Sequence, residues 1–250
     1  MIHPTAIIEE GAILGQDCEI HAYAIVRKYA ILGDRVTVHP FAVVGGDPQD
    51  LKFNPVVPTY ARVGSGTTVR EGVTVNRSTS EGEATVVGEN CLLMAECHVA
   101  HDCILGNRVI LANAVLLAGH VMVEDFAILG GNAVVHQFCR IGEGSILSGS
   151  SRITRDVAPF TMAAERDEVI GLNSVGLKRR GISRSTVMEI KDAFSAVYLE
   201  GRNPRDAAKA LLETGAKSPE VLRFLKFFGA GKRGFVPARR GTSAENGGEE

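Results

Sequence analysis

Apolar residues recur at every sixth position along most of the first 153 residues of this chain. The register comprises Ile2, Ile8, Leu14, Ile20, Val26, Leu32, Val38 and Val44, then Val63, Val69 and Val75, then Val87, Leu93, Val99, Leu105, Leu111, Leu117, Val123, Leu129, Val135, Ile141, Leu147 and Ile153. A period of six matches neither the 3.6-residue period of an α-helix nor the simple alternation of one strand. It is typical of a parallel β-helix of hexapeptide repeats, each contributing one short strand and one turn. Three repeats complete a triangular coil, so residues 18 positions apart are expected to stack about 4.8 Å apart.

A second column of small residues supports this interpretation. The fourth residue after each anchor is mostly Ala, Val or Cys, and all five cysteines occupy the column: Cys18, Cys91, Cys97, Cys103 and Cys139. Only small side chains fit inside a narrow core at native packing density, so the column is predicted to point inward. We therefore interpret the cysteines as buried thiols in place of disulfide or zinc partners, and expect a reducing cytoplasmic environment.

Glycine follows many of the anchors directly, as at Gly15, Gly33, Gly88 and Gly106. Glycine adopts positive φ at little cost, so these residues are expected to supply the left-handed conformation that tight corners need.

The repeat predicts a β-helix over residues 1–158, with excursions from the coil near 45–60 and 78–85. Residues 159–229 are expected to form a helical C-terminal domain, because Ser183, Asn203-Pro204 and Ser218-Pro219 are typical helix starts. The polar, glycine-rich segment 230–250 is predicted to be a disordered tail. The expected fold class is thus an all-β parallel β-helix with a C-terminal α-helical domain.

Composition narrows the possible functions. The chain is 45% hydrophobic and 22% charged with a net charge of −2, so nothing indicates a nucleic-acid partner. The most apolar stretch, 109–122, keeps the six-residue period and predicts β-helix wall in place of a membrane span. The chain opens directly into the first repeat, without the pattern of a secretory signal. Nucleotide-loop and dinucleotide fingerprints are absent, and no cofactor or metal is expected.

The seven histidines fall into two groups. His3, His21 and His39 are 18 positions apart, which predicts a structural column at one corner. The others are His98, His101, His120 and His136. The 18-residue rule then predicts three neighbouring stacks: His101, Gly119 and Gln137; Asp102, His120 and Phe138; Ala100, Ala118 and His136. An imidazole base beside a bare glycine amide is the arrangement needed for direct acyl transfer, with the amide facing the developing oxyanion. No G-x-S-x-G elbow is present and the cysteines point inward, so no acyl-enzyme is expected.

Several motifs carry a resemblance to one enzyme family. They are HVAHDC at 98–103, GNR at 106–108, LAGH at 117–120, DFAI at 125–128, GG at 130–131, VHQFC at 135–139, QDLK at 49–52 and GLKRRG at 176–181. In order and type they resemble the UDP-N-acetylglucosamine O-acyltransferases, over nearly all of residues 1–229. The chain departs from the family pattern at 164–168 and at Val175, where some members carry an acid.

The resemblance implies a left-handed β-helix that forms a homotrimer, with the active site between subunits. It implies transfer of an (R)-3-hydroxyacyl group from acyl carrier protein to the 3-hydroxyl of UDP-N-acetylglucosamine, the first step of lipid A biosynthesis. By correspondence His101 is the general base, Asp102 its neighbour and Gly119 the oxyanion donor. The substrate-binding residues implied are Gln49, Asp50, Lys52, His98, His120, His136, Gln137, Asn173, Arg179 and Arg180. Gly149 matches the position that limits acyl length, and its missing side chain predicts a longer hydroxyacyl chain; its alternative interpretation is a structural corner.

On residue alternation alone, Asp102 and His101 are expected to point to opposite faces, which leaves the role of Asp102 open. Two other functions are compatible with a β-helix. One is an N-acyltransferase acting on an amino-sugar nucleotide of the same pathway, and the other is a β-helix zinc carbonic anhydrase with histidine ligands. The second gives no role to Gln137 or to the basic residues Arg179 and Arg180.

Overall fold

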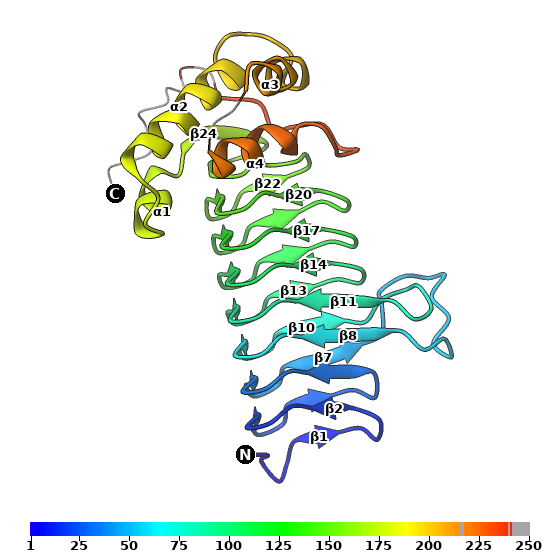
Figure 1. Cartoon of the computed structure of the whole chain (residues 1–250). Coiled ribbons are helices and arrows are strands. Elements are labelled where there is room, and N and C mark those ends of the chain that lie inside the picture. Colours follow the sequence, from blue (N-terminus) through cyan, green and yellow to red (C-terminus); the bar gives the residue numbers. More distant parts are fainter. Residues whose placement is uncertain (216–217, 240, 242–250) are drawn as a thin grey trace.

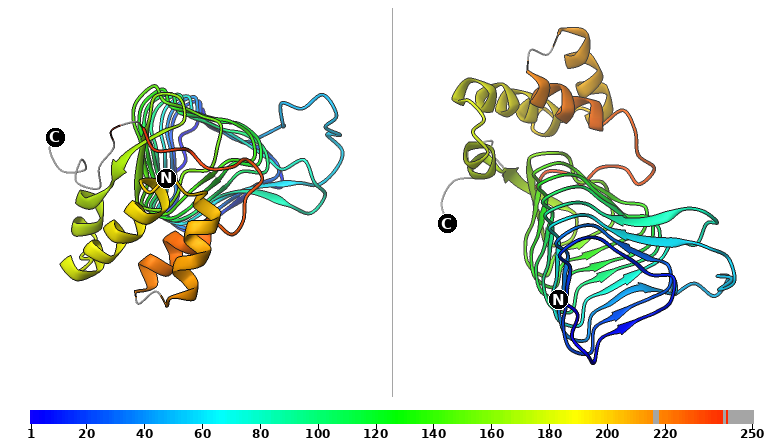
Figure 2. Two further views of the ribbon diagram at one scale, coloured as in Figure 1. Left: turned by 90° about the horizontal axis from the view of Figure 1, so that it is seen from above. Right: turned by 60° about the horizontal axis from the view of Figure 1, so that its bottom comes forward.

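Three β-sheets, in which all strands but the last pair in parallel, form the walls of a prism that is triangular in cross-section (Figures 1 and 2). The computed structural model describes residues 1–215, 218–239 and 241. Sheet 1 contains β1 (Ile7–Ile8), β4 (Ile25–Val26), β7 (Val43–Gly46), β10 (Thr74–Asn76), β13 (His98–Val99), β16 (Leu116–Leu117), β19 (Val134–Val135) and β22 (Arg152–Ile153). Sheet 2 contains β2 (Ile13–Leu14), β5 (Ala30–Leu32), β8 (Tyr60–Val63), β11 (Ala84–Val87), β14 (Ile104–Leu105), β17 (Met122–Val123) and β20 (Arg140–Ile141).

Sheet 3 is the longest wall because a hairpin extends it beyond the last coil. It contains β3 (Glu19–Ile20), β6 (Thr37–Val38), β9 (Thr68–Val69), β12 (Leu92–Leu93), β15 (Ile110–Leu111), β18 (Ile128–Leu129), β21 (Ile146–Leu147), β23 (Thr161–Ala164) and β24 (Glu168–Leu172). Strand β23 pairs parallel with β21 and antiparallel with β24. The sequence predicted helical chain from residue 159, and the hairpin corrects that expectation. Its strands lack the six-residue period that marks the coils.

The predicted register is confirmed along the prism. Neighbouring coils pair residues 18 positions apart, as in His98 with Leu116 and Leu116 with Val134. Where Val43 pairs with Thr74 and Thr74 with His98, the additional residues leave the coil as loops, and the ladder continues with one register shift between Val75 and Asn76. Both loops project from one edge of the prism (Figure 1). The coils form the left-handed parallel β-helix that the sequence and the resemblance predicted.

The two inward columns fill the core. Leu93, Leu105 and Leu117 are fully buried, and the small column that includes Cys103 is buried from Cys18 onward. Each of four cysteine thiols donates a hydrogen bond to a carbonyl of the next coil, for example Cys103 Sγ to the Ala118 oxygen at 3.2 Å. Burial raises the pKa of Cys97 to about 11. The thiols are therefore packing groups, as predicted.

The role expected for the glycines that follow the anchors is wrong. Of these, only Gly45 has a positive φ, whereas the left-handed corner residue is the third after the anchor, such as Asp102, His120 or Phe126. The glycines are required instead because coils approach closely at that point. A Cβ on Gly88 would lie 2.3 Å from the Gly106 oxygen. Left-handed residues recur in nearly every coil, so this conformation at Asp102 and His120 belongs to the fold as a whole.

The C-terminal helices lie at one end of the prism and project to one side of it (Figures 1 and 2). They are α1 (Ser174–Arg179), α2 (Arg184–Tyr198), α3 (Pro204–Glu213) and α4 (Pro219–Phe227). The last three begin where the sequence predicted, each with its capping side chain from Ser183, Asn203 or Ser218 accepting a backbone N–H. The short α1 was not predicted. No described helix is long and apolar enough to cross a membrane.

The segment after α4 is ordered up to residue 239, which corrects the expectation of a disordered tail. Phe235 forms an isolated parallel β-bridge with Asp156, and Ala238 forms another with Val169. Residues 240 and 242–250, also part of that expectation, lie outside the described residues. The Asp156 side chain is buried and binds the Arg140 guanidinium at 2.8 Å. Arg140 also donates to the carbonyl oxygens of Phe227 and Ala230. One ion pair therefore joins the last coil to the returning chain.

Replacing Asp156 by Ala should destabilise the protein strongly, because the Arg140 guanidinium would stay largely buried without its counterion. The expected loss is about 3–5 kcal/mol of unfolding free energy, measured by urea denaturation. Glu200→Ala, which removes an exposed partner of Arg202 at 3.9 Å, is the control and should change little. A loss below about 1 kcal/mol for Asp156→Ala would contradict this role for the pair.

Candidate active site

His101 lies just after β13, at the corner where sheet 1 meets sheet 2. A Cβ on Gly119 would lie 2.6 Å from His101 Cε1 and 2.8 Å from its Nε2. The imidazole of His101 therefore covers Gly119 on the next coil, and the predicted stack is confirmed. Any side chain at position 119 would displace the imidazole.

Asp102 points to the same side as His101. Its Oδ2 lies 2.7 Å from His101 Nδ1. The expectation that the two side chains face opposite ways is wrong, because both residues are in the corner and Asp102 has a φ of 60°. Strand alternation applies only up to Val99, the last residue of β13.

The Asp102 carboxylate is held as an anion. Burial opposes its ionisation, but hydrogen bonds from Ser78, Thr79 and His101 outweigh this effect, and the pKa of Asp102 is lowered. A carboxylate next to Nδ1 keeps the proton on that nitrogen, which leaves a lone pair on His101 Nε2. The dyad therefore presents a base toward Gly119.

The backbone N–H of Gly119 has no hydrogen-bond acceptor among the described residues. At the corner between sheets 2 and 3 the corresponding N–H groups are satisfied. Glu89 N–H donates to Asn107 Oδ1 and Asn107 N–H to Asp125 Oδ1, both at 2.8 Å. At the His101 corner the equivalent residue is Gln137, which does not accept a hydrogen bond from Gly119 N–H, so a donor is left available beside the base. It is suited to stabilise a developing oxyanion.

Two further histidines surround the dyad. His120 Nε2 lies 3.6 Å from Asp102 Oδ2, and its ring stacks on Phe138 at 4.6 Å, as the sequence predicted. His98 projects from β13, where its Nδ1 is 2.7 Å from the Thr74 hydroxyl. Burial, and to a smaller extent His101, lowers the pKa of His98. His98 is therefore a neutral hydrogen-bonding group at neutral pH.

The ligand atoms of His101, Asp102 and His120 lie within 4.8 Å of one another, so these residues could together hold a metal ion. The same atoms also form the hydrogen bonds that orient the dyad. Within the described chain the group contains two imidazoles, whereas the carbonic anhydrase alternative calls for three histidine ligands.

Gln137 and His136 lie at the same corner, two coils beyond His101, and are exposed. His136 lines a pocket of about 330 Å³ on the outer face of sheet 1, together with Arg152 and Arg166. Both arginines were overlooked in the sequence, although Arg152 is an outward strand position of the repeat. The pocket is a basic surface of sheet 1, and its lining contains neither His101 nor Asp102.

Gln49, Asp50 and Lys52 are exposed on the first loop and do not contact His101 within one chain. Buried Arg77 holds this loop: it donates to Asp47 Oδ1 at 2.9 Å and to the carbonyl oxygens of Pro55 and Val57 at 2.8 and 2.9 Å. Sequence reasoning missed Arg77, because nothing in a repeat pattern marks a buried arginine inside an excursion.

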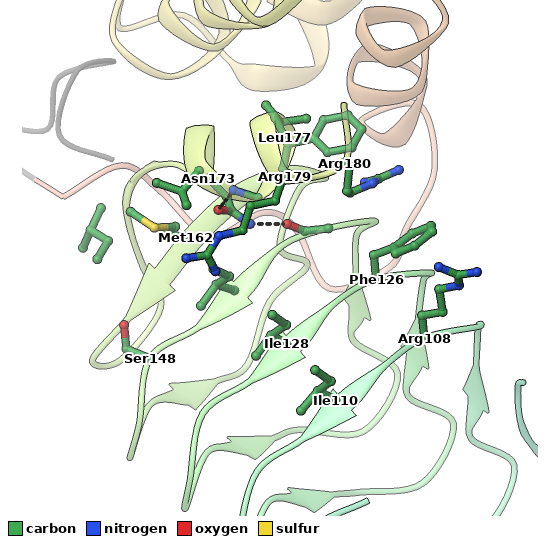
Figure 3. A pocket seen from close by; sticks show the side chains of 16 residues that line it. Arg108, Ile110, Phe126, Ile128, Ser148, Met162, Asn173, Leu177, Arg179 and Arg180 are labelled. Atoms are coloured by element: carbon green, nitrogen blue, oxygen red, sulfur yellow. Dashed lines mark hydrogen bonds between the residues drawn. The ribbon is translucent and has the colours of Figure 1, made fainter. Parts of the chain in front are cut away.

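Asn173, Arg179 and Arg180 line a separate pocket of about 680 Å³ between α1 and the outer face of sheet 3 (Figure 3). Asn173 caps α1, accepting from Gly176 N–H and donating to the Gly144 oxygen, both at 2.8 Å. Arg180 pairs with the nearly buried Glu143 and packs 4.2 Å from the Phe126 ring centroid.

Arg179 and Arg108 are the exposed basic residues of this pocket, and neither has an ion-pair partner in the part of the chain that the structure describes. Within one chain this pocket lies on sheet 3, whereas His101 lies at the corner of sheets 1 and 2. The structure therefore does not bring the predicted binding residues into one cleft.

Gly149 lies at the third corner, between β21 and β22. It is exposed and its φ is not positive, and a Cβ there would lie 3.4 Å from its nearest neighbour, the Gly131 oxygen. A side chain at this position would be accommodated without strain. The alternative interpretation of Gly149 as a conformationally required corner is therefore wrong.

Comparison with known protein families agrees with the fold. A model described as "Udp N-acetylglucosamine O-acyltransferase; Domain 2" matches residues 156–236. A model of six bacterial transferase hexapeptide repeats matches residues 11–46 and 84–119.

Among curated proteins, an acyl-[acyl-carrier-protein]–UDP-N-acetylglucosamine O-acyltransferase of Alkalilimnicola ehrlichii is 40% identical over 119 residues. This match covers 47% of this chain and 46% of the relative. A second, from a Janthinobacterium species, is 39% identical over 123 residues, or 47% of each chain. The chain thus spans about half the length of the curated relatives it matches.

Solved structures match over the whole chain. The UDP-N-acetylglucosamine acyltransferase from Campylobacter jejuni is 37% identical with a TM-score of 0.85, covering 96% of this chain and 100% of that one. The corresponding enzyme from Bacteroides fragilis is 34% identical with a TM-score of 0.87, covering 94% and 100%. With this identity over nearly its full length, and with the same fold, the chain belongs to the UDP-N-acetylglucosamine O-acyltransferase family.

Proposed function

We propose that this protein transfers an (R)-3-hydroxyacyl group from acyl carrier protein to the 3-hydroxyl of UDP-N-acetylglucosamine, the first step of lipid A biosynthesis. One observation carries the proposal: the His101–Asp102 dyad faces Gly119, whose N–H has no acceptor among the described residues. The names of the solved and curated relatives supply the substrates. Location in the cytoplasm stays a prediction from the sequence.

The chemistry requires no covalent enzyme intermediate. His101 Nε2 removes the proton of the sugar hydroxyl as its oxygen attacks the thioester carbonyl. The negative charge that develops on the carbonyl oxygen is stabilised by Gly119 N–H. Collapse of the tetrahedral species breaks the carbon–sulfur bond, and the imidazolium returns its proton to the departing thiolate. The products are the 3-O-acylated sugar nucleotide and free carrier thiol. Asp102 stabilises the imidazolium between the two proton transfers.

We propose further that the working form is a homotrimer. The dyad, Arg179 and Gly149 lie at different walls or corners of one prism, so a complete cleft needs a neighbouring copy. Several outer strand positions of sheets 1 and 2 are apolar and exposed, with Ile104 at 47% and Leu116 and Met122 at 46%. Flat apolar walls of this kind pack on one another in a closed ring. The projecting loop with Gln49, Asp50 and Lys52 would reach the next subunit.

Incubation with UDP-N-acetylglucosamine and a series of 3-hydroxyacyl carrier proteins, with products identified by mass, tests the function. An ester on the 3-hydroxyl is expected. Acylation only of a 3-amino sugar nucleotide supplied in parallel would overturn the proposal in favour of the N-acyltransferase alternative.

Replacing His101 by Ala should lower kcat by about 10²–10⁴-fold, because a positioned base contributes this much. Stability should be nearly unchanged, since the side chain is part of the corner surface and not of the apolar core. His3→Ala, at an exposed corner of the first coil, is the control and should keep full activity. Activity of His101→Ala within a few-fold of wild type would refute the assignment.

Arg179→Ala and Arg180→Ala should behave differently. Arg179 is exposed in the pocket, so its loss should raise KM for the nucleotide sugar by roughly 10- to 100-fold while the melting temperature stays constant. Arg180→Ala should also lower the melting temperature, because Glu143 loses a partner. Lys178→Ala, an exposed change on the same helix, should alter neither quantity. A fall in kcat at constant KM for Arg179→Ala would argue against binding.

Gly149→Met should shift the preference toward shorter acyl chains, because the structure accepts a side chain here and its bulk would project outward. Each excluded methylene forfeits about 0.8 kcal/mol of burial, or about fourfold in the ratio of rates between two chain lengths. Competition between donors of different length measures this ratio. Glu10→Met on the first coil is the control; an unchanged preference in Gly149→Met would show that acyl length is limited elsewhere.

A further inference from the structure

The Asp102 carboxylate is bound by more donors than His101 alone. Ser78 Oγ donates to Asp102 Oδ1, and Thr79 Oγ1 donates to Oδ2 at 2.7 Å. The Thr79 backbone N–H lies 3.2 Å from Oδ1. Both oxygens of the carboxylate are therefore fixed by the second excursion, between β10 and β11.

Ser80 in this excursion and Thr85 in β11 complete the contacts around Asp102. Ser80 N–H donates to Ser78 Oγ at 3.0 Å, which directs the hydroxyl proton toward the carboxylate. The backbone N–H of Asp102 donates to Thr85 Oγ1 at 2.8 Å. Ser78 and Thr85 are fully buried and the Asp102 side chain is only 11% exposed, so water competes little for these bonds.

We propose that Ser78 and Thr79 are positioning residues that hold the Asp102 carboxylate against His101 Nδ1 and so direct the basic Nε2 toward Gly119. Their effect on rate rests on the proposed function, whereas their effect on the orientation of His101 does not. Neither hydroxyl touches the reacting atoms.

The physical argument is one of restricted rotation. A carboxylate bound only by one imidazole can rotate about its Cβ–Cγ bond and share the Nδ1 proton between both oxygens. Two hydroxyl donors on opposite oxygens remove this freedom, and charge-assisted hydrogen bonds of this type are the strong ones. Loss of either hydroxyl should misalign the base without changing the sugar-binding surface.

The test compares Thr79→Val, which keeps the shape but removes the hydroxyl, with Thr79→Ser, which keeps the hydroxyl. Ser78→Ala is the second site. We expect kcat to fall about tenfold in Thr79→Val and in Ser78→Ala with KM within twofold of wild type, and Thr79→Ser to retain most of kcat. In an Asp102→Ala background, Thr79→Val should cause no further loss, because the two residues act through one carboxylate.

A measurement without substrate separates this inference from the proposed function. Diethyl pyrocarbonate modifies neutral imidazole nitrogen, and mass spectrometry can follow His101 against His3 as an internal reference. We expect His101 modification to slow at least threefold in Thr79→Val and to stay normal in Thr79→Ser. Slower modification in a protein that shows no acyl transfer would support the positioning role and refute the function. An unchanged modification rate, or equal losses of kcat from Thr79→Val with and without Asp102, would overturn the inference.

Discussion

Parallel pairing of strands 18 residues apart is the constraint on which the whole molecule depends. Each coil donates its backbone hydrogen bonds to the next, so a residue is placed by its position within the coil and by the number of the coil. His101 and Gly119 come together for this reason alone. No packing of long helices or distant strands is needed to form the pair, and the two loops leave the coil with only a local register shift in the ladder.

The conformation of the corners that close each coil also positions the side chains of the active site. A left-handed residue three positions after the anchor turns its side chain outward along the edge, which aligns Asp102 with His120 and Phe138 in one column. At the corner between sheets 2 and 3, the residues one position before the left-handed ones include Asn107 and Asp125, whose side chains accept hydrogen bonds from backbone N–H groups of the preceding coil. At the dyad the same positions hold His101, Gly119 and Gln137, and the Gly119 N–H is left for a substrate. The site is thus a variation on a structural element that the fold repeats elsewhere.

Most of the fold could be predicted from the sequence, because the six-residue period specifies strands, register and stacking. The stacks of His101 on Gly119 and of His120 on Phe138 followed directly. The conformations of individual corners did not follow: the anchor glycines were assigned the wrong physical role, and Asp102 was expected to face away from His101. Ser78, Thr79 and Arg77 were missed because they lie in excursions, where no period relates sequence distance to spatial distance. The hairpin β23–β24 and the ordered residues up to 239 were missed for the same reason. The ion pair of Glu143 with Arg180 was also missed, because nothing in the sequence relates these two residues.

A scaffold counted in coils can change its dimensions only in whole steps. Inserting one or two repeats would rotate all later strands onto a different wall, so that a residue such as Gly119 would no longer lie beside His101. Additional residues that do not complete a coil are therefore accommodated only as a loop. Distances along the prism axis are therefore multiples of about 4.8 Å. The length of a cleft along this axis can therefore change only by whole coils. Any smaller change in that length has to come from the size of a single side chain within one coil.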